Sequence, residues 1–302
     1  MKPLLSIIIV NYNTKELLQK CLKSVISDQW LVVSKKTPIT SHQSLTTEII
    51  VVDNGSTDGS VEMVTSGQWL VASEKTKKTP ITNHQSPATI RLIKNQTNLG
   101  FAKAVNQGIK QSRGEYLLLL NSDIVVKPNS IKRLVDFAKK HPGVGVVGGR
   151  LLNLDGSIQG SCFYLPTISR AFREFWLKQK KFPITQKYAP AGDKPVEVEA
   201  VVGAVFLIPK KVLAKVGFLD ERYFMYFEDL DYCRRVRKAG LKVFYVPQAE
   251  FIHYHGLSGK KIPEKTQKWL VESSQIYHGC LKYYLLSLII WTGQKCQKIF
   301  EK

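Results

Sequence analysis

The sequence predicts an α/β protein in which helices flank a mostly parallel sheet, with a helical extension at the C-terminal end. Two observations carry this prediction. Apolar, strand-like runs alternate with helix-like periodic stretches through the first half of the chain, and the segment 259–302 combines apolar and aromatic clusters with flanking lysines. Alternation of strands and helices is typical of parallel sheets that helices cover.

The expected elements of the first half follow one another in a regular order. Apolar runs such as LLSIIIV and EYLLLLN have the length of strands, and the stretches that follow them have helical periodicity. The expected strands are 4–10, 47–53, 90–95 and 115–121, and the expected helices are 14–26, 56–66, 100–112 and 129–141.

Two copies of one motif interrupt this order. The stretch QWLVVSKKTPITSHQSLTTEI begins at residue 29, and the similar stretch QWLVASEKTKKTPITNHQSPATI begins at residue 68. Both copies fall between a helix and the next strand, at the end of an open parallel sheet opposite to the one where ligands bind. We therefore interpret 29–47 and 68–89 as surface insertions and discount their histidines as ligands.

The net charge of +20 is high for 302 residues. It favours a membrane surface or phosphate groups over nucleic acid as the partner, because no aromatic-rich RNA-binding motif accompanies it. The five cysteines are scattered and lack C-x-x-C spacing, which indicates reduced thiols and a cytoplasmic protein. The apolar start of the chain is interpreted as a first strand, not a signal peptide.

Polar clusters end the first, second and fourth expected strands. They are Asn11-Tyr12-Asn13, Asp53-Asn54-Gly55-Ser56 and Asn121-Ser122-Asp123. The carboxyl ends of parallel strands meet at one edge of a sheet, so the clusters outline a crevice. A strand, turn and capped helix would explain Ser56 but leaves Asp53 without a role. We interpret Asp53 as an acceptor for the N3–H of a uracil or thymine ring.

Six blocks of the sequence together resemble the family 2 glycosyltransferases, whose GT-A fold is related to the Rossmann fold. The rhamnosyltransferase-like branch is the most similar, and the resemblance runs from about residue 3 to 258. It implies a domain at 1–258, with a nucleotide-binding half to about 125, an acceptor and catalytic half from 126, and a separate tail at 259–302. The blocks are SIIIVNYNTKELLQKCLKSV, EIIVVDNGSTDGS, NLGFAKAVNQGI, LLLNSDIVV, GAVFLIPKKVLAKVGFLDERYFMYFEDLDYCRRVRKAGLKVFYVP and HYHGLS.

The resemblance implies a donor site and a metal site. Asp123 would bind a divalent ion, Mg²⁺ or Mn²⁺, with His253 as a further ligand and His255 as its alternative. Asn121 stands where a strict D-x-D motif has aspartate, so the site carries one charge fewer. The residues expected to bind the nucleotide-sugar are Val10, Asn11, Tyr12, Asp53, Asn98, Gly100, Asn121 and Ser122.

The resemblance also assigns the general base to Asp229, within the aromatic-rich block FMYFEDLDYCRRVRK. Helix N-terminal acids favoured by the macrodipole are the plainer interpretation of this block. Glu228 and Asp231, three residues apart, would share a helix face and support the base by pairing with arginines. Gly203 would let the acceptor approach the backbone, although close packing in the sheet explains it equally well.

The expected function is inverting transfer of a sugar from a nucleotide-diphospho-sugar to a saccharide hydroxyl in cell-surface polysaccharide synthesis. On resemblance, the donor is dTDP-rhamnose or a UDP-sugar, and the acceptor is a saccharide or a lipid-linked saccharide. The basic tail either lies on an anionic membrane, at the inner face of the cell membrane, or covers an exposed sheet face. The alternative function is a non-catalytic, nucleotide-sugar-binding or scaffolding relative in a membrane assembly.

Overall fold

The computed structural model describes residues 2–30, 46–67, 88–179, 183–184, 186–254 and 263–300. The insertions predicted at 29–47 and 68–89 fall for the most part outside these residues, as does His255. The alternation of strands and helices predicted for the first half is confirmed. Its elements are β1 (Leu5–Asn11), α1 (Lys15–Trp30), β2 (Thr47–Asp53), α2 (Ser60–Ser66), β3 (Ala88–Lys94), α3 (Phe101–Gln111) and β4 (Tyr116–Asn121).

The second half adds further strands and helices, of which the last two helices are C-terminal. Its elements are β5 (Ile124–Val126), α4 (Ser130–Lys140), β6 (Val144–Leu152), β7 (Ile158–Gln159), β8 (Cys162–Phe163), α5 (Ile168–Phe175), β9 (Val196–Val198), β10 (Ala200–Val201), β11 (Val205–Pro209), a 3₁₀ turn (Lys210–Val212), α6 (Leu213–Val216), α7 (Glu228–Lys238), β12 (Lys242–His253), α8 (Pro263–His278) and α9 (Cys280–Phe300).

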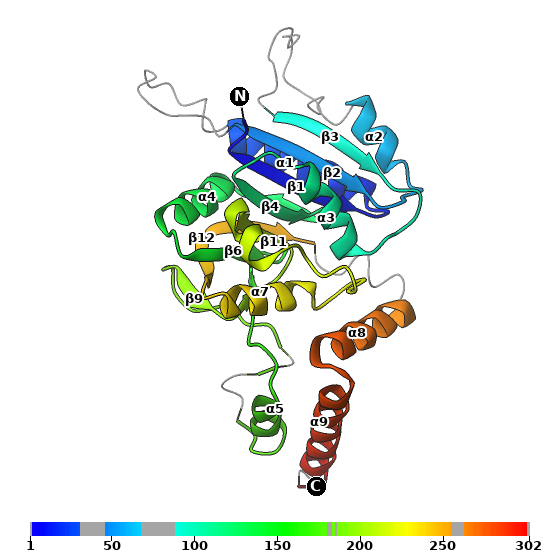
Figure 1. Ribbon diagram of the computed structural model, residues 1–302, viewed down its shortest axis with the longest axis vertical. Coiled ribbons are helices and arrows are strands. Elements are labelled where there is room, and N and C mark those ends of the chain that lie inside the picture. The colour runs from blue at the N-terminus through cyan, green and yellow to red at the C-terminus, as the bar shows by residue number, and fades with distance from the viewer. Residues whose placement is uncertain are drawn as a thin grey trace.

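The main sheet follows the order β3-β2-β1-β4-β11-β6-β12-β5, with β7 beside β6 and β9 beside β12 (Figure 1). Strands β3, β2, β1 and β4 are parallel to one another, and β12 is parallel to β6. Strand β11 runs antiparallel to both of its neighbours, and β5 and β9 run antiparallel to β12. The sheet is therefore parallel through the N-terminal half and mixed beyond β4.

Successive side chains of β1 point to opposite faces of the sheet, as the two-residue period of a strand requires. Ile7 and Ile9 belong to the buried layer that contains Leu18 of α1, whereas Ile8 belongs to the layer that contains Val105 of α3. A Cβ atom at Gly108 of α3 would lie only 2.5 Å from Ile8 Cγ2, so this glycine permits α3 to pack closely on the sheet.

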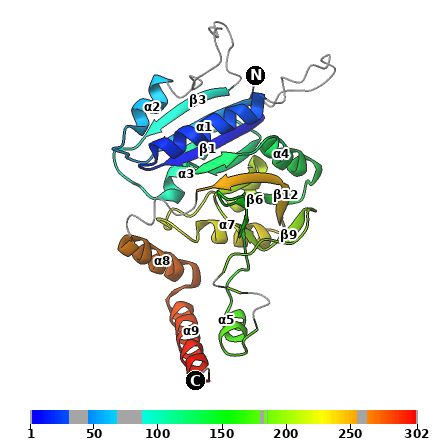
Figure 2. The ribbon, with the colours of Figure 1, turned by 180° about the vertical axis from the view of Figure 1, so that it is seen from behind.

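The two C-terminal helices extend away from the sheet (Figure 2). Helix α8 follows the described end of β12, and α9 continues to the end of the described chain beside α5. In the residues that the structure describes, we find no helix long and apolar enough to cross a membrane.

Candidate active site

The polar clusters that end β1, β2 and β4 lie side by side at one edge of the sheet. The three strands are adjacent, and their register pairs Asn11 with Asp53 and Val10 with Asn121. The carboxyl ends of the strands are therefore level, which places the first predicted nucleotide-binding residues and the start of the Asn121-Ser122-Asp123 segment along one line.

Hydrogen bonds join the first two clusters. Asn11 Nδ2 donates to Asp53 Oδ2 at 3.0 Å and to Ser56 Oγ at 3.1 Å, while the Ser56 N–H donates to Asp53 Oδ1 at 2.9 Å. Asp53 is 2% exposed and its neighbour Tyr12 is 39% exposed. Asp53 thus fixes Asn11 and the turn after β2, and Tyr12, the residue after Asn11, lies at the surface. A contact between Asp53 and a nucleotide base stays a prediction.

A hydroxyl pair extends this network to the third cluster. Thr14 Oγ1 donates to Asn11 Oδ1 at 2.7 Å and lies 2.8 Å from Ser122 Oγ. Because the single hydroxyl proton of Thr14 goes to Asn11, the Ser122 hydroxyl donates to Thr14. Ser122 is buried and therefore positions the segment that leads to Asp123.

Asn54 is a positioning residue that the sequence placed only within the polar cluster after the second expected strand. Its Oδ1 accepts from the Leu99 N–H at 3.1 Å, and its Nδ2 donates to Asn98 Oδ1 at 2.9 Å. Asn98 Oδ1 also accepts from the Gly100 N–H at 3.0 Å. The side chain of Asn54 therefore holds the predicted donor segment around Asn98 and Gly100 beside the end of β2. Its partners lie more than forty positions away, so local sequence could not reveal them.

Gly100 brings this segment against the chain that precedes α7. Its φ of +87° is in the region that favours glycine, and a Cβ atom there would lie 2.8 Å from the Phe224 carbonyl oxygen. The next residue, Phe101, donates its N–H to the same oxygen at 2.7 Å. The structure thus requires glycine where the segment before α3 meets the chain before α7.

Asp123 and His253 face each other across the end of the sheet. His253 Nε2 lies 3.4 Å from Asp123 Oδ1, and His253 Nδ1 lies 2.7 Å from Gln159 Oε1. An amide oxygen only accepts hydrogen bonds, so the hydrogen lies on Nδ1, and this N–H donates a hydrogen bond to Gln159 Oε1. Nε2 of the same ring then faces an Asp123 oxygen that is buried and accepts no hydrogen bond among the described residues.

This pair of acceptors fits a divalent cation. An imidazole whose other nitrogen is held by a hydrogen bond is the usual form of a histidine ligand. No group of three or more histidine, cysteine or acidic side chains in the described ranges could form a complete protein cage. Mg²⁺ is commonly held by only one or two carboxylates together with substrate phosphates, so a small protein ligand set is compatible with such an ion.

Asp229 lies in the first turn of α7 and contacts the chain before β11. Its Oδ2 accepts from the Gly203 N–H at 2.9 Å, and its Oδ1 accepts from the Leu230 N–H at 2.8 Å. Burial raises the pKa of Asp229 above the ordinary aspartate range, although these two N–H groups and the Lys187 charge act in the opposite direction. Burial, and then the neighbouring Asp229 charge, also raise the pKa of Glu228.

Asp231 pairs with two arginines of its own helix, and its predicted role as a support of the base stays a prediction. Its Oδ1 accepts from Arg234 at 2.6 Å and its Oδ2 accepts from Arg235 at 2.7 Å. Arg235 also donates to the carbonyl oxygens of Val216 and Phe218, which lie before α7. Asp231 therefore anchors α7 to the preceding chain, and Glu228, buried with an unbonded Oε2, does not share this role.

The two halves of the predicted site are joined through β4 and the chain that enters β11. The Asn121 N–H donates to the Ala204 carbonyl oxygen at 3.0 Å, and the residue before Ala204 is the glycine that binds Asp229. The structure thus brings Asp53, Asn121 and Asp229 into one continuous row of contacts along the sheet edge.

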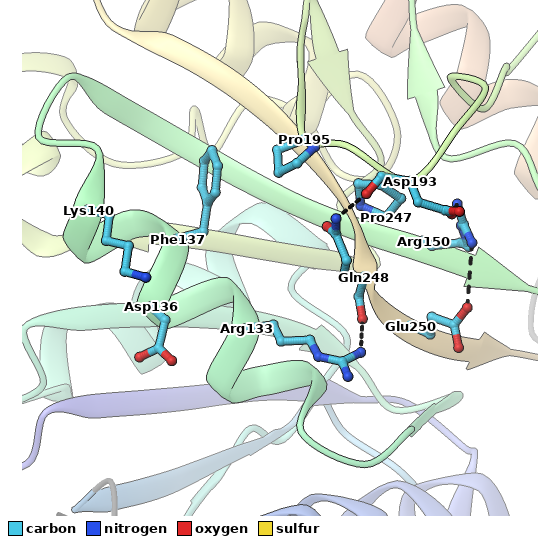
Figure 3. A pocket seen from close by; sticks show the side chains of 10 residues that line it. All are labelled: Arg133, Asp136, Phe137, Lys140, Arg150, Asp193, Pro195, Pro247, Gln248 and Glu250. Atoms are coloured by element: carbon cyan, nitrogen blue, oxygen red, sulfur yellow. Dashed lines mark hydrogen bonds and ion pairs between the residues drawn. The ribbon is translucent and has the colours of Figure 1, made fainter.

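A small cavity borders Asp229, and a larger hollow lies away from the predicted site. A cavity of about 10 Å³ is lined by Gly203, Glu228 and Asp229 together with Phe101 of the predicted donor segment. A larger hollow of about 560 Å³ lies between α4 and β12 and contains none of the predicted site residues (Figure 3). Arg150 pairs there with Asp193 at 2.8 Å and Glu250 at 3.6 Å, so two carboxylates that line the hollow already balance the charge of Arg150.

The sequence of this chain is similar to those of known glycosyltransferases. Residues 6–190 match the family described as Glycosyl transferase family 2, and residues 116–298 match Glycosyl transferase family group 2. An N-acetylglucosaminyl-diphospho-decaprenol L-rhamnosyltransferase of Mycobacterium tuberculosis (strain H37Rv) is 31% identical over 73% of this chain and 72% of its own length. Glycosyltransferase GlyG of Streptococcus pneumoniae is 26% identical over 74% of this chain and 62% of its own length.

Solved structures confirm the predicted GT-A-like fold. GalNAc-T7, crystallised with UDP, GalNAc and Mn²⁺, superposes with a TM-score of 0.57 at 16% identity, over 85% of this chain and 44% of its own. Staphylococcus aureus TarS gives a TM-score of 0.54 at 16% identity, over 92% and 39%. This chain thus spans less than half of either structure. On the sequence matches, the chain belongs to glycosyl transferase family 2.

Proposed function

We propose that the chain transfers a sugar from a nucleotide-diphospho-sugar to a saccharide hydroxyl with inversion, and that Asp229 is the general base. The observation that carries the proposal is the setting of Asp229, in which two backbone N–H groups orient a carboxylate whose pKa burial raises. A base whose pKa is closer to the working pH accepts a proton more effectively in the transition state.

The proposed reaction is a single displacement. The acceptor hydroxyl oxygen forms a bond to the anomeric carbon as the bond from that carbon to the diphosphate oxygen breaks, and the hydroxyl proton passes to Asp229. The nucleoside diphosphate leaves with the bonding electron pair. Glu228, whose pKa is also raised, lies beside the base and keeps a second negative charge from developing there.

The donor would lie along the sheet edge. We place the nucleotide against Val10, Asn11, Tyr12 and the segment at Asn98 and Gly100. Asp53 would accept a hydrogen bond from the nucleotide's pyrimidine ring. The diphosphate would then lie near Asn121, Ser122 and Asp123. The exposure of Tyr12 at the edge and the network that orders the surrounding turns support this placement.

Asp123 and His253 are the residues that would hold a divalent cation, which we infer to be Mg²⁺ or Mn²⁺. Such an ion supplies positive charge that stabilises a diphosphate leaving group. The unbonded Asp123 oxygen and the hydrogen bond that orients His253 support this assignment. Gln159 would then act as a positioning residue for the histidine.

We infer a dTDP- or UDP-linked donor, with dTDP-rhamnose first, and a saccharide acceptor that is carried on a lipid. The name of the Mycobacterium tuberculosis relative, which specifies rhamnose transfer to a decaprenol-linked sugar, supports both choices. Polysaccharide or glycan synthesis is the process in which such a transfer takes part. The five free cysteines support action on the cytoplasmic side, where thiols remain reduced.

A thermal-shift and turnover series tests the proposal. We expect a dTDP- or UDP-sugar to raise the melting temperature, and Mn²⁺ to increase that shift, because a ligand that binds only the folded state stabilises it more as its concentration rises above its dissociation constant. Asp53→Asn should reduce the shift, whereas Asp155→Asn, in an exposed turn, should not. Release of nucleoside diphosphate should require an acceptor. If no nucleotide-sugar shifts the melting temperature, the proposal fails.

A further inference from the structure

Helices α5 and α9 form a unit that we call the foot, residues 168–178 and 280–297. They lie side by side away from the sheet in both views (Figure 1 and Figure 2). A Cβ atom at Gly293 would lie 2.7 Å from Phe175 Cβ, so the helices approach closely at this glycine. Trp176 Nε1 donates to the Ile289 carbonyl oxygen at 3.2 Å, and Gln297 Nε2 donates to the Phe175 carbonyl oxygen at 2.7 Å.

The foot exposes apolar side chains that a water-soluble helix would bury. Leu281 is 85% exposed and Trp291 is 54% exposed, with Tyr284 and Leu288 between them on the same face. These positions recur at intervals of three and four residues, which is the pattern of a continuous helical stripe. Trp176 at the end of α5 is 43% exposed, so the second helix of the foot also presents an aromatic side chain to the surface.

This stripe has the periodicity of a core-facing surface but no protein covers it in the described chain. Most of the other large apolar side chains in the described ranges are buried in the two layers of the sheet. A contiguous exposed apolar surface of this kind marks a site where a protein or a membrane is bound.

The positive charge of the foot favours an anionic lipid surface as the partner. The α9 sequence contains lysines and no acidic residue, and Lys295 Nζ lies 4.0 Å from the centre of the exposed Trp291 ring. Lys282 and Lys178 add further positive charge to the foot. Lysine and tryptophan side chains that combine an apolar body with a polar or charged end are typical of the boundary between lipid headgroups and acyl chains.

A second copy of the chain is a poorer partner for the same surface. In a twofold contact the same patch faces itself, so the lysines of one copy would face the lysines of the other. An anionic bilayer offers the opposite charge over the whole surface, and each lysine near it adds to the attraction. Charge complementarity therefore favours the membrane.

We propose that the foot docks on an anionic lipid bilayer, with the stripe from Leu281 to Trp291 in the boundary between headgroups and acyl chains and with the lysines on the headgroups. Helix α9 then lies along the surface of the bilayer. Segments more than a hundred residues apart contribute to the foot, so the membrane contact belongs to the folded protein and not to the tail alone. The proposal goes beyond glycosyl transfer and does not depend on which sugar is moved.

Co-sedimentation of the full-length chain with vesicles tests the proposal. We expect binding to phosphatidylcholine vesicles that contain phosphatidylglycerol, little binding to phosphatidylcholine alone, and weaker binding as salt is raised. The variant Leu281→Ser/Tyr284→Ser/Leu288→Ser should bind at least about tenfold more weakly, because each substitution removes apolar area from the contact. The matched control Leu154→Ser/Ile158→Ser changes apolar side chains that are equally exposed elsewhere and should bind like the wild type.

Charge is tested separately. Lys282→Glu/Lys295→Glu should weaken binding to the anionic vesicles, and Lys211→Glu/Lys215→Glu, on another surface, should weaken it much less. Wild-type binding that is equal with and without phosphatidylglycerol would overturn the proposal without any variant. A triple-serine variant that binds vesicles normally but converts a dimer into a monomer in sedimentation velocity would also overturn it. Donor binding is measured without vesicles, so its failure counts against the proposed function and not against the foot.

Discussion

At the scale of single residues, the account depends on how the protein treats two adjacent carboxylates. Asp229 accepts two backbone hydrogen bonds, whereas Glu228 has a buried oxygen without a partner. Burial raises both pKa values, but the N–H groups of Gly203 and Leu230 and the Lys187 charge favour the charged form of Asp229, whereas only its own backbone N–H does so for Glu228. The carboxylate that ionises more readily is therefore the one that the backbone orients, as a base requires.

The raised pKa of Asp229 predicts the pH dependence of the reaction. A base acts when it is deprotonated, so kcat/KM should fall on the acid side at a pH above the ordinary aspartate pKa of about 3.9. Lys187 lowers the pKa of Asp229 through its charge. Lys187→Met should therefore move the acid limb to higher pH, and Lys194→Met should leave it in place. A limb that moves to lower pH in the Lys187 variant would contradict this assignment.

Residue types and their order predicted much of the site but not its internal contacts. The polar clusters after β1, β2 and β4 were visible because each ends an apolar run, and register brings them together. The sequence could not show that Asn54 holds Asn98, or that Gln159 orients His253, because these partners meet only after the sheet forms. Predicted contacts with the donor and the metal stay predictions.

At the scale of elements, α8 holds the chain that leads into α7. Tyr226 and Phe227, directly before Glu228, have φ values of 71° and 66°. Left-handed conformations are uncommon for such bulky residues and cost of order 1–3 kcal/mol each. Ser273 Oγ of α8 donates to the Met225 carbonyl oxygen at 2.8 Å, and Trp269 packs on Phe224 with ring centres 4.7 Å apart. These contacts stabilise the strained entry to α7, the helix to which we assign the base.

A single hydroxyl tests this role of α8. Ser273→Ala should cost about 1 kcal/mol of folding free energy and should lower kcat while leaving the donor KM nearly unchanged, because the carboxylates of α7 lose a fixed position. Ser27→Ala removes a hydroxyl that bonds within an exposed turn of α1 and serves as the control. Steady-state kinetics distinguish the two. Equal kcat values for the two variants would show that α8 does not position the base.

The strands of the first half were predictable, and the strand directions of the second half were not. A run such as VFLIP indicates a buried strand, but buried strands of either direction have the same composition. The structure shows that β11 is antiparallel to β4 and β6. The approach of α5 to α9 at Gly293 likewise depends on tertiary packing, which the sequence pattern does not show.

At the scale of the whole molecule, the basic residues fall into two groups by their surroundings. Many cations outside the foot pair with carboxylates, as Arg91 does with Glu48 and Arg234 with Asp231. The lysines of the foot accompany exposed apolar side chains and are the ones we assign to the membrane. This division explains why total charge alone favoured an anionic partner without locating its contact surface.

The central claim is that Asp229 accepts the proton of the acceptor hydroxyl, while other residues bind the sugar donor. The most direct test compares turnover and donor binding in Asp229→Asn, with Asp155→Asn as the control for loss of a surface charge. The account predicts that turnover falls by about 10²–10⁴-fold while the melting-temperature shift caused by the donor stays nearly the same. Turnover close to that of the wild type in Asp229→Asn would contradict it.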